Sequence, residues 1–209
     1  MAWGGVIMII TVAHTKGGVG KSTLSWNLAH SIRAKGEKVT IIDLDFQQTL
    51  YFINDIASHN GHVPMEVLQP QSGSELIEIL QDHHGYIIID VGGFDNDINR
   101  IAISYADKIL VPVSNSVTEV IGFKTFEAIL DDIEATSINI VLNNIHPLQK
   151  DFKDISKAVS TLDGAKLLKT TIRARKTYKD TLTLGKSVFN YEDLKALKEI
   201  EGLRDELIS

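Results

Sequence analysis

The stretch Thr15-Lys16-Gly17-Gly18-Val19-Gly20-Lys21-Ser22-Thr23 follows an apolar run and precedes a segment with helical spacing. Glycines let backbone N–H groups approach an anion, and a following helix points its positive N-terminal end at the same anion. In such a loop Lys21 neutralises the β- and γ-phosphates of a nucleotide, and the Ser22 hydroxyl binds Mg²⁺. A plain glycine-rich turn requires none of these polar side chains, so the stretch predicts a phosphate-binding loop.

The same loop carries a second lysine. Thr15 stands where the ordinary G-x-x-x-x-G-K-[ST] pattern begins with glycine, and Lys16 follows it. Two ammonium groups beside one triphosphate repel each other unless more negative charge arrives. We therefore predict that Lys16 serves the nucleotide of another subunit.

Short runs rich in Val and Ile alternate with longer segments of helical period along the chain. Most of these runs are apolar throughout, which is typical of parallel strands covered on both faces. The predicted strands are 7–13, 38–44, 86–91, 108–113, 139–143 and 167–172, with a short edge strand at 64–68. The predicted helices are 21–35, 49–59, 73–81, 96–106, 116–134, 152–162, 176–184 and 191–207.

This alternation predicts a doubly wound α/β fold, with a mostly parallel sheet of about seven strands and helices on both faces. The 209 residues include 4 Pro and no Gly/Ser tract, so we expect one domain spanning residues 1–209. Met8 leads directly into the first strand and is a candidate natural start, so we expect residues 1–7 to be an extension or a remnant of cloning. Ser72 and Glu75 have the spacing of a capping box and predict a helix start, whereas Gly36 predicts a helix stop.

The composition excludes several classes of protein. The chain has no Cys, which excludes a disulfide scaffold, a thiolate zinc site, a Cys-held iron–sulfur cluster and a Cys nucleophile. Apolar residues make up 44%, which is enough for a core, but the longest apolar runs fall far short of the ~20 residues of a membrane span. No basic residue precedes the first apolar stretch, so we expect a cytoplasmic protein.

Carboxylates end two of the predicted strands. Asp43 and Asp45 lie at the end of the second strand, and Asp90 lies near the end of strand 86–91. Open α/β sheets bind ligands at the carboxyl ends of their strands, so these side chains are expected beside the phosphates. For Asp43 a catalytic role and the capping of a turn remain equally open.

A basic strip lies on this chain of net charge −6. Seven Lys and Arg lie between Lys166 and Lys186, against one acid. The candidates for contact with DNA phosphates are Arg173, Arg175, Lys176, Lys179 and Lys186. Such contacts give binding that is independent of sequence and sensitive to salt. The alternative is a solvated helix face.

The last predicted helix has an apolar stripe, formed by Leu194, Leu197, Ile200, Leu203 and Leu207. The stripe predicts docking on the sheet. A helix that lies on a membrane surface is usually basic, but this one carries more acids than bases. We therefore expect no stable membrane association.

The segment from Lys16 to Thr23 resembles the deviant Walker A motif of the ParA/MinD ATPases, which belong to the SIMIBI class of P-loop NTPases. The resemblance implies ATP and Mg²⁺ as cofactors. It also implies a sandwich dimer that forms with ATP, in which Lys16 reaches the phosphates of the partner. The nucleotide-binding residues that it implies in this loop are Lys16, Gly17, Gly18, Val19, Gly20, Lys21, Ser22 and Thr23.

Two further segments are similar to elements of this family. The segment from Asp43 to Gln47 resembles its D-x-D-P-Q segment, and the strand with Asp90 resembles its Walker B strand. By this resemblance Lys16, Lys21 and Asp45 are catalytic, with Asp45 orienting the attacking water, and Ser22, Asp45 and Asp90 form the metal site. Phe46 replaces the usual Pro and Val91 the usual Thr, which predicts slow hydrolysis.

Separate residues are candidates for binding the base of the nucleotide. Strand 139–143 resembles the family strand that ends in an adenine-reading Asn, which leaves Asn143 and Asn144 open, and either could instead cap a turn. Ile172 lies in a segment similar to the loop that packs on the adenine ring.

The resemblance implies a short ParA-type partition ATPase, because the phosphate loop begins near residue 15. Such a protein binds DNA nonspecifically as a dimer, is stimulated by a ParB-like partner, associates with the nucleoid and moves plasmid or chromosomal DNA. The alternatives are a MinD-like or cargo-positioning ATPase acting on a membrane or protein scaffold, and a small-molecule ligase such as a dethiobiotin synthetase. Iron–sulfur carriers of the same class are excluded by the absence of Cys.

Overall fold

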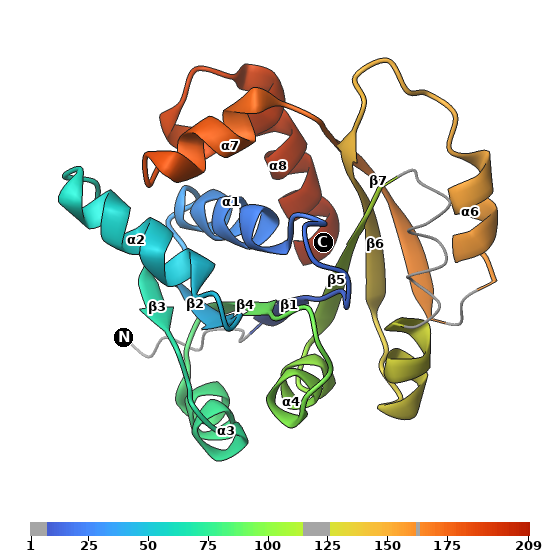
Figure 1. The fold of residues 1–209 in the computed structure, drawn as a ribbon, viewed down its shortest axis with the longest axis horizontal. Helices are drawn as coiled ribbons and strands as arrows, with labels where there is room; N and C mark the ends of the chain where they lie inside the picture. The colour runs from blue at the N-terminus through green and yellow to red at the C-terminus, as the bar shows by residue number, and fades with distance from the viewer. Residues whose placement is uncertain (1–7, 115–125, 162–163) are drawn as a thin grey trace.

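The computed structural model describes residues 8–114, 126–161 and 164–209. Seven strands form one sheet in the order β3-β2-β4-β1-β5-β6-β7, and every pair is parallel (Figure 1). The strands are β1 (Met8–Val12), β2 (Val39–Leu44), β3 (Glu66–Leu68), β4 (Tyr86–Val91), β5 (Lys108–Val113), β6 (Ile138–Ile145) and β7 (Ala165–Arg173). The predicted doubly wound sheet is confirmed.

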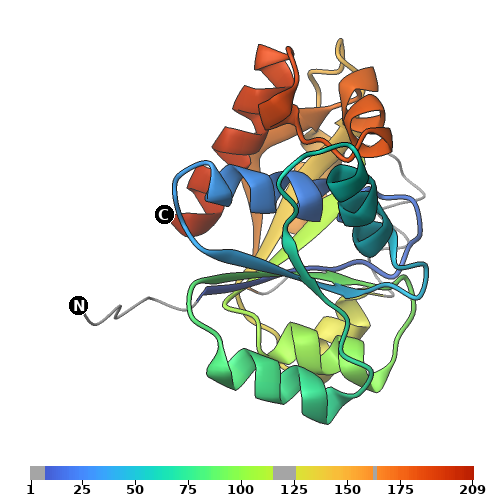
Figure 2. The ribbon, with the colours of Figure 1, turned by 90° about the vertical axis from the view of Figure 1, so that its left-hand side faces the viewer.

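Helices cover both faces of the sheet (Figures 1 and 2). They are α1 (Lys21–Arg33), α2 (Thr49–His59), α3 (Gly73–Asp82), α4 (Asp97–Ser104), α6 (Lys153–Val159), α7 (Lys176–Thr183), the 3-10 helix η1 (Val188–Asn190) and α8 (Leu194–Ile208), with residues 126–132 also helical. One core cluster lies under α1, α2, α7 and α8, and the other under α3, α4, α6 and 126–132. The strands are apolar along their length because both of their faces are buried in these two clusters.

The order of the strands places the phosphate loop at the centre of the sheet. β1 pairs with β4 on one side and with β5 on the other, so the chain changes direction across β1. Parallel α/β sheets bind ligands at such a switch point, outside the carboxyl ends of the strands. The loops that follow β1, β2 and β4 therefore meet at one place.

The predicted starts and stops of two helices are confirmed. The Ser72 hydroxyl accepts a hydrogen bond from the backbone N–H of Glu75 and caps α3. Gly36 follows the end of α1 with φ +84°, a conformation that suits glycine.

The C-terminal part of the chain differs from the prediction. β7 runs over nine residues and is longer than predicted, and α8 begins at Leu194 rather than at 191. The helix starts there because the carboxylate of Asp193 accepts hydrogen bonds from the backbone N–H groups of Lys195 and Ala196. The buried stripe of α8 consists of Ala196, Ile200, Leu203 and Leu207, so the predicted place of Leu194 in it was wrong: Leu194 is 74% exposed.

Carboxylates of α8 cover the outer edge of β7. The Glu206 carboxylate accepts hydrogen bonds from the N–H groups of Lys169 and Thr170, and Glu199 accepts one from that of Arg173. An edge strand otherwise leaves such donors exposed and open to pairing with another chain. These bonds satisfy backbone donors of β7 where its pairing with β6 is irregular.

Two predictions concern residues that lie partly or wholly outside the described ranges. The predicted helix 116–134 is helical over 126–132, and its part from 116 to 125 lies outside the described residues, as do residues 1–7.

Among the helices of the described ranges, none has the length and apolar character that crossing a bilayer requires.

Candidate functional site

The phosphate loop joins β1 to α1. Gly20 caps α1 in a left-handed conformation with φ +94°. A Cβ at this position would lie 2.4 Å from Nδ2 of Asn143, which itself donates to the carbonyl of Val19 at 2.7 Å. Glycine is thus required twice here, by its backbone conformation and by the approach of a side chain from β6.

A cavity of about 570 Å³ opens at this loop. It is lined by Gly17, Gly18, Gly20, Lys21, Ser22, Thr23, Asp45, Phe46, Gln47, Thr49, Gly93 and Phe94. Its walls come from the loops after β1, β2 and β4 and from the first turns of α1 and α2. The volume lies within the range of small-molecule and cofactor sites in proteins.

The two lysines of the loop lie in different environments. Lys21 lines the cavity and is 6% exposed, and its Nζ donates to the carbonyl of Lys16 at 3.4 Å. Burial lowers the pKa of Lys21, against the raising effect of Asp90 and Asp45. The side chain of Lys16 is exposed and is not among those that line the cavity.

Asp90 lies at the end of β4, fully buried. Burial raises its pKa to about 7, and the nearby Ser22 hydroxyl acts in the opposite direction. Its Oδ1 accepts a bond of 3.3 Å from the Ser25 hydroxyl, while its Oδ2 has no hydrogen-bond partner among the described residues. A buried carboxylate oxygen without a donor, close to a hydroxyl and a lysine, fits a cation or its bound water.

The two carboxylates after β2 have different surroundings. Asp45 is half-buried, lines the cavity and accepts a hydrogen bond from the N–H of Gln47. Asp43 accepts bonds from the N–H groups of Asp45, Leu50 and Tyr51, the last two in the first turn of α2. Of the two roles left open for Asp43, catalysis and the capping of a turn, these contacts favour the capping role.

None of the three predicted base-binding residues, Asn143, Asn144 and Ile172, is among those that line this cavity. Asn143 is 7% exposed and its amide is bound to the phosphate loop, whereas Asn144 is exposed with φ +56°. Ile172 is 2% exposed and lies in the core cluster that packs against α1 and α8. A side chain at this depth supports the fold, and the packing of this segment on a base stays a prediction.

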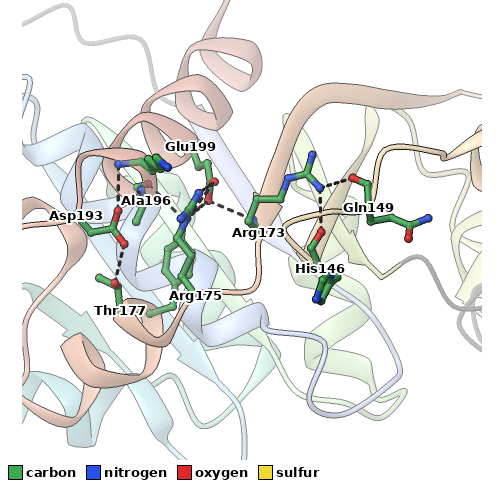
Figure 3. A network of polar contacts seen from close by, with 10 residues as sticks. His146, Gln149, Arg173, Arg175, Thr177, Asp193, Ala196 and Glu199 are labelled. Carbon is green, nitrogen blue, oxygen red and sulfur yellow. Dashed lines mark hydrogen bonds and ion pairs between the residues drawn. The ribbon is translucent and has the colours of Figure 1, made fainter.

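The predicted basic strip is divided between internal contacts and solvent (Figure 3). The guanidinium of Arg175 pairs with Glu199 at 2.5 Å, and that of Arg173 donates to the carbonyls of His146 and Gln149. Two other residues of the strip, Lys176 and Lys179, are exposed on α7, and Lys186 is half-buried.

Several residues that make important contacts in the structure were not singled out from the sequence. Ser25 lies one helical turn after Ser22, so the spacing could have shown that both hydroxyls share one face of α1. Glu199 and Glu206 lie far along the chain from the groups that they bind, and nothing local marks them.

The fold and the phosphate loop define a P-loop NTPase. Residues 10–203 match the family model of the CobQ/CobB/MinD/ParA nucleotide binding domain, CbiA, so the chain belongs to this family of nucleotide-binding ATPases.

Known proteins resemble the chain over most of its length. It is 25% identical over 208 residues to the maintenance of carboxysome distribution protein A of Halothiobacillus neapolitanus, covering 95% of each chain. It is 29% identical over 133 residues to protein ParA of Rhizobium radiobacter, covering 61% of this chain and 58% of that protein. A solved Cyanothece McdA–ATP complex has a TM-score of 0.75 at 17% identity, covering 98% of this chain and 97% of the other, and shares its fold.

Proposed function

We propose that this chain is a ParA-type ATPase that dimerises on ATP and uses slow hydrolysis to move DNA or another cargo. The observation that carries the proposal is the division between the two lysines of one loop: Lys21 is buried in the cavity, and Lys16 is exposed outside it. Lys21 neutralises the phosphates of its own nucleotide. In this proposal Lys16 meets the phosphates of a second copy.

The other polar groups have complementary roles in this proposal. Ser22, Asp45 and Asp90 hold Mg²⁺, which when bound offsets charge on the phosphates. Asp45 orients the water that attacks the γ-phosphate in line, and the lysines stabilise the charge that develops. The loop after β4 approaches the phosphate loop closely, since a Cβ on Gly93 would lie 3.4 Å from the carbonyl of Thr15.

Lys16→Ala is expected to abolish dimerisation by ATP. The wild-type chain should elute as a dimer with ATP and Mg²⁺ and as a monomer with ADP, measured by size exclusion with light scattering. The variant should remain monomeric with both nucleotides while it still binds ATP. Lys35→Ala, an exposed lysine just beyond the other end of α1, is the matched control and should dimerise normally. A wild-type monomer under every condition would refute the proposed dimer.

Nonspecific DNA binding and a ParB-like partner complete the proposal, with the dimer associated with the nucleoid. Two observations support a role in positioning: the full-length likeness to a carboxysome distribution protein and the partial likeness to ParA. The exposed Lys176 and Lys179 are the side chains of the strip that face solvent for phosphate contacts. The internal pairing of Arg173 and Arg175 favours a second candidate, a cargo-positioning ATPase that acts on a protein scaffold.

Replacing both Lys176 and Lys179 by Ala is expected to weaken nonspecific DNA binding by the ATP-bound dimer. Each lost phosphate contact reduces the slope of log affinity against log salt by about 0.9, so the slope should fall by about 2. Fluorescence anisotropy with a duplex of arbitrary sequence, titrated at several salt concentrations, measures both quantities. Lys195→Ala with Lys198→Ala, two exposed lysines on α8, is the control. An unchanged slope in the α7 variant would favour the scaffold candidate.

A further inference from the structure

Ser25 lies in the second turn of α1 and is fully buried. Its hydroxyl is 3.0 Å from the carbonyl oxygen of Lys21 and 3.3 Å from Oδ1 of Asp90. The first contact lies within the helix. The second joins α1 to the end of β4, across 65 residues of sequence.

The contact with β4 leaves the two oxygens of Asp90 unequal. Oδ1 is held by Ser25, whereas Oδ2 has no hydrogen-bond partner among the described residues. An unsatisfied buried oxygen is costly, and its cost is recovered when a ligand or a bound water meets it. A carboxylate that binds a cation is commonly itself held by a second group, which sets its orientation.

We propose that Ser25 is a positioning residue that orients the carboxylate of Asp90 so that Oδ2 meets the Mg²⁺ of the nucleotide or its bound water. This inference rests on the proposed role of Asp90 in the metal site. Ser25 does not touch the nucleotide or the cation, and it acts through Asp90 alone.

A purely structural role is the competing explanation for this serine. Serines inside helices often donate to the carbonyl four residues earlier, as Ser25 does to Lys21. One hydroxyl has one proton, so at any moment it donates to Lys21 or to Asp90. If Ser25 only supported Lys21, its loss would weaken phosphate binding equally with and without metal. If Ser25 orients Asp90, its loss weakens binding of the metal.

The test compares Ser25→Ala with the wild-type chain in two binding measurements. Mn²⁺ replaces Mg²⁺ as the probe, and its affinity for the ADP complex is read from the EPR signal of free Mn²⁺. The affinity for ADP in EDTA is measured separately by calorimetry. Ser25→Ala should weaken Mn²⁺ binding about 10- to 100-fold, as is typical when a group that orients a metal ligand is lost. ADP affinity in EDTA should stay within a factor of about two.

Matched variants distinguish the sources of the effect. Ser31→Ala removes another fully buried serine hydroxyl of α1, which accepts from Arg204 at 2.9 Å, and should leave both affinities unchanged. Ser25→Cys fills the same site with a weak donor and should give an intermediate Mn²⁺ affinity, which keeps the test valid if Ser25→Ala does not fold. Asp90→Asn tests the metal site itself.

Each remaining outcome has a definite meaning. Unchanged Mn²⁺ affinity in Ser25→Ala and Ser25→Cys, together with a loss in Asp90→Asn, would overturn the role of Ser25 and leave the metal site intact. Equal losses with and without metal would assign Ser25 to the support of Lys21 and would overturn the proposal as well. Unchanged Mn²⁺ affinity in Asp90→Asn would refute the proposed function of Asp90.

Discussion

Lys21→Ala is expected to weaken ATP binding, because the lysine ammonium offsets phosphate charge, and to slow hydrolysis by roughly 100- to 1000-fold, since one preorganised donor to a transition state contributes about 10²–10³ in rate. Lys21 lies 6% exposed in a cavity lined by glycines, where its charge is screened less than in open water. No other cationic side chain is among the residues that line this cavity in the described parts of the chain.

Thermal unfolding with and without nucleotide measures the loss. A ligand at 100 times its dissociation constant stabilises the folded state by about 2.7 kcal/mol, so ATP should raise the melting temperature of the wild-type chain and not that of the variant. Lys35→Ala is again the control, because it removes an exposed lysine near the same helix. An unchanged ATP-induced shift in Lys21→Ala would show that the phosphates bind elsewhere.

Asp90→Asn is expected to make the nucleotide-free protein more stable than wild type above neutral pH. Burial raises the pKa of Asp90 to about 7. The folded chain therefore keeps a proton that the unfolded chain has already released, and stability is lost as pH rises from about 4 to about 7. Each pH unit in this window costs about 1.4 kcal/mol. Asparagine has no charge to bury and avoids this cost.

Urea unfolding between pH 5 and pH 8, without nucleotide or metal, provides the measurement. The stability of the variant relative to wild type should grow by about 1.4 kcal/mol for each unit up to pH 7 and then level off. Taking the difference removes the contributions of groups that do not interact with Asp90. Asp43 is not one of these, because its charge acts on Asp90 and burial also raises its own pKa. Asp82→Asn, which removes an exposed carboxylate at the end of α3, is the matched control. A constant difference for Asp90→Asn would show that its carboxylate is not buried in this form.

The proposed metal site lowers the stability of the nucleotide-free protein, because its carboxylate is buried without a cation. The same burial that makes the ionised Asp90 costly leaves its Oδ2 unsatisfied in the nucleotide-free chain. A bound cation removes this cost, so nucleotide and metal together should stabilise the protein more than nucleotide alone.

Local patterns in the chain were sufficient for the fold and for the phosphate loop. Apolar strands in alternation with amphipathic helices define a parallel sheet with two covered faces, because only that arrangement buries every apolar run. The glycine and lysine spacing from Lys16 to Lys21 defines the anion site, since backbone N–H groups and the helix terminus that bind phosphate are contiguous in sequence. Asp45 lines the cavity and Asp90 lies buried near the end of β4, as expected where parallel strands end together, and their roles toward a metal stay predictions.

Only the tertiary structure decided how distant side chains pair. It assigned the carboxylate of Asp43 to the start of α2, the amide of Asn143 to the phosphate loop and Ile172 to the core. It also divided the basic residues between internal partners and solvent, although all of them look alike in the sequence. Each of these outcomes depends on contacts between segments far apart in the chain, and neither charge nor spacing within one segment specifies such a partner.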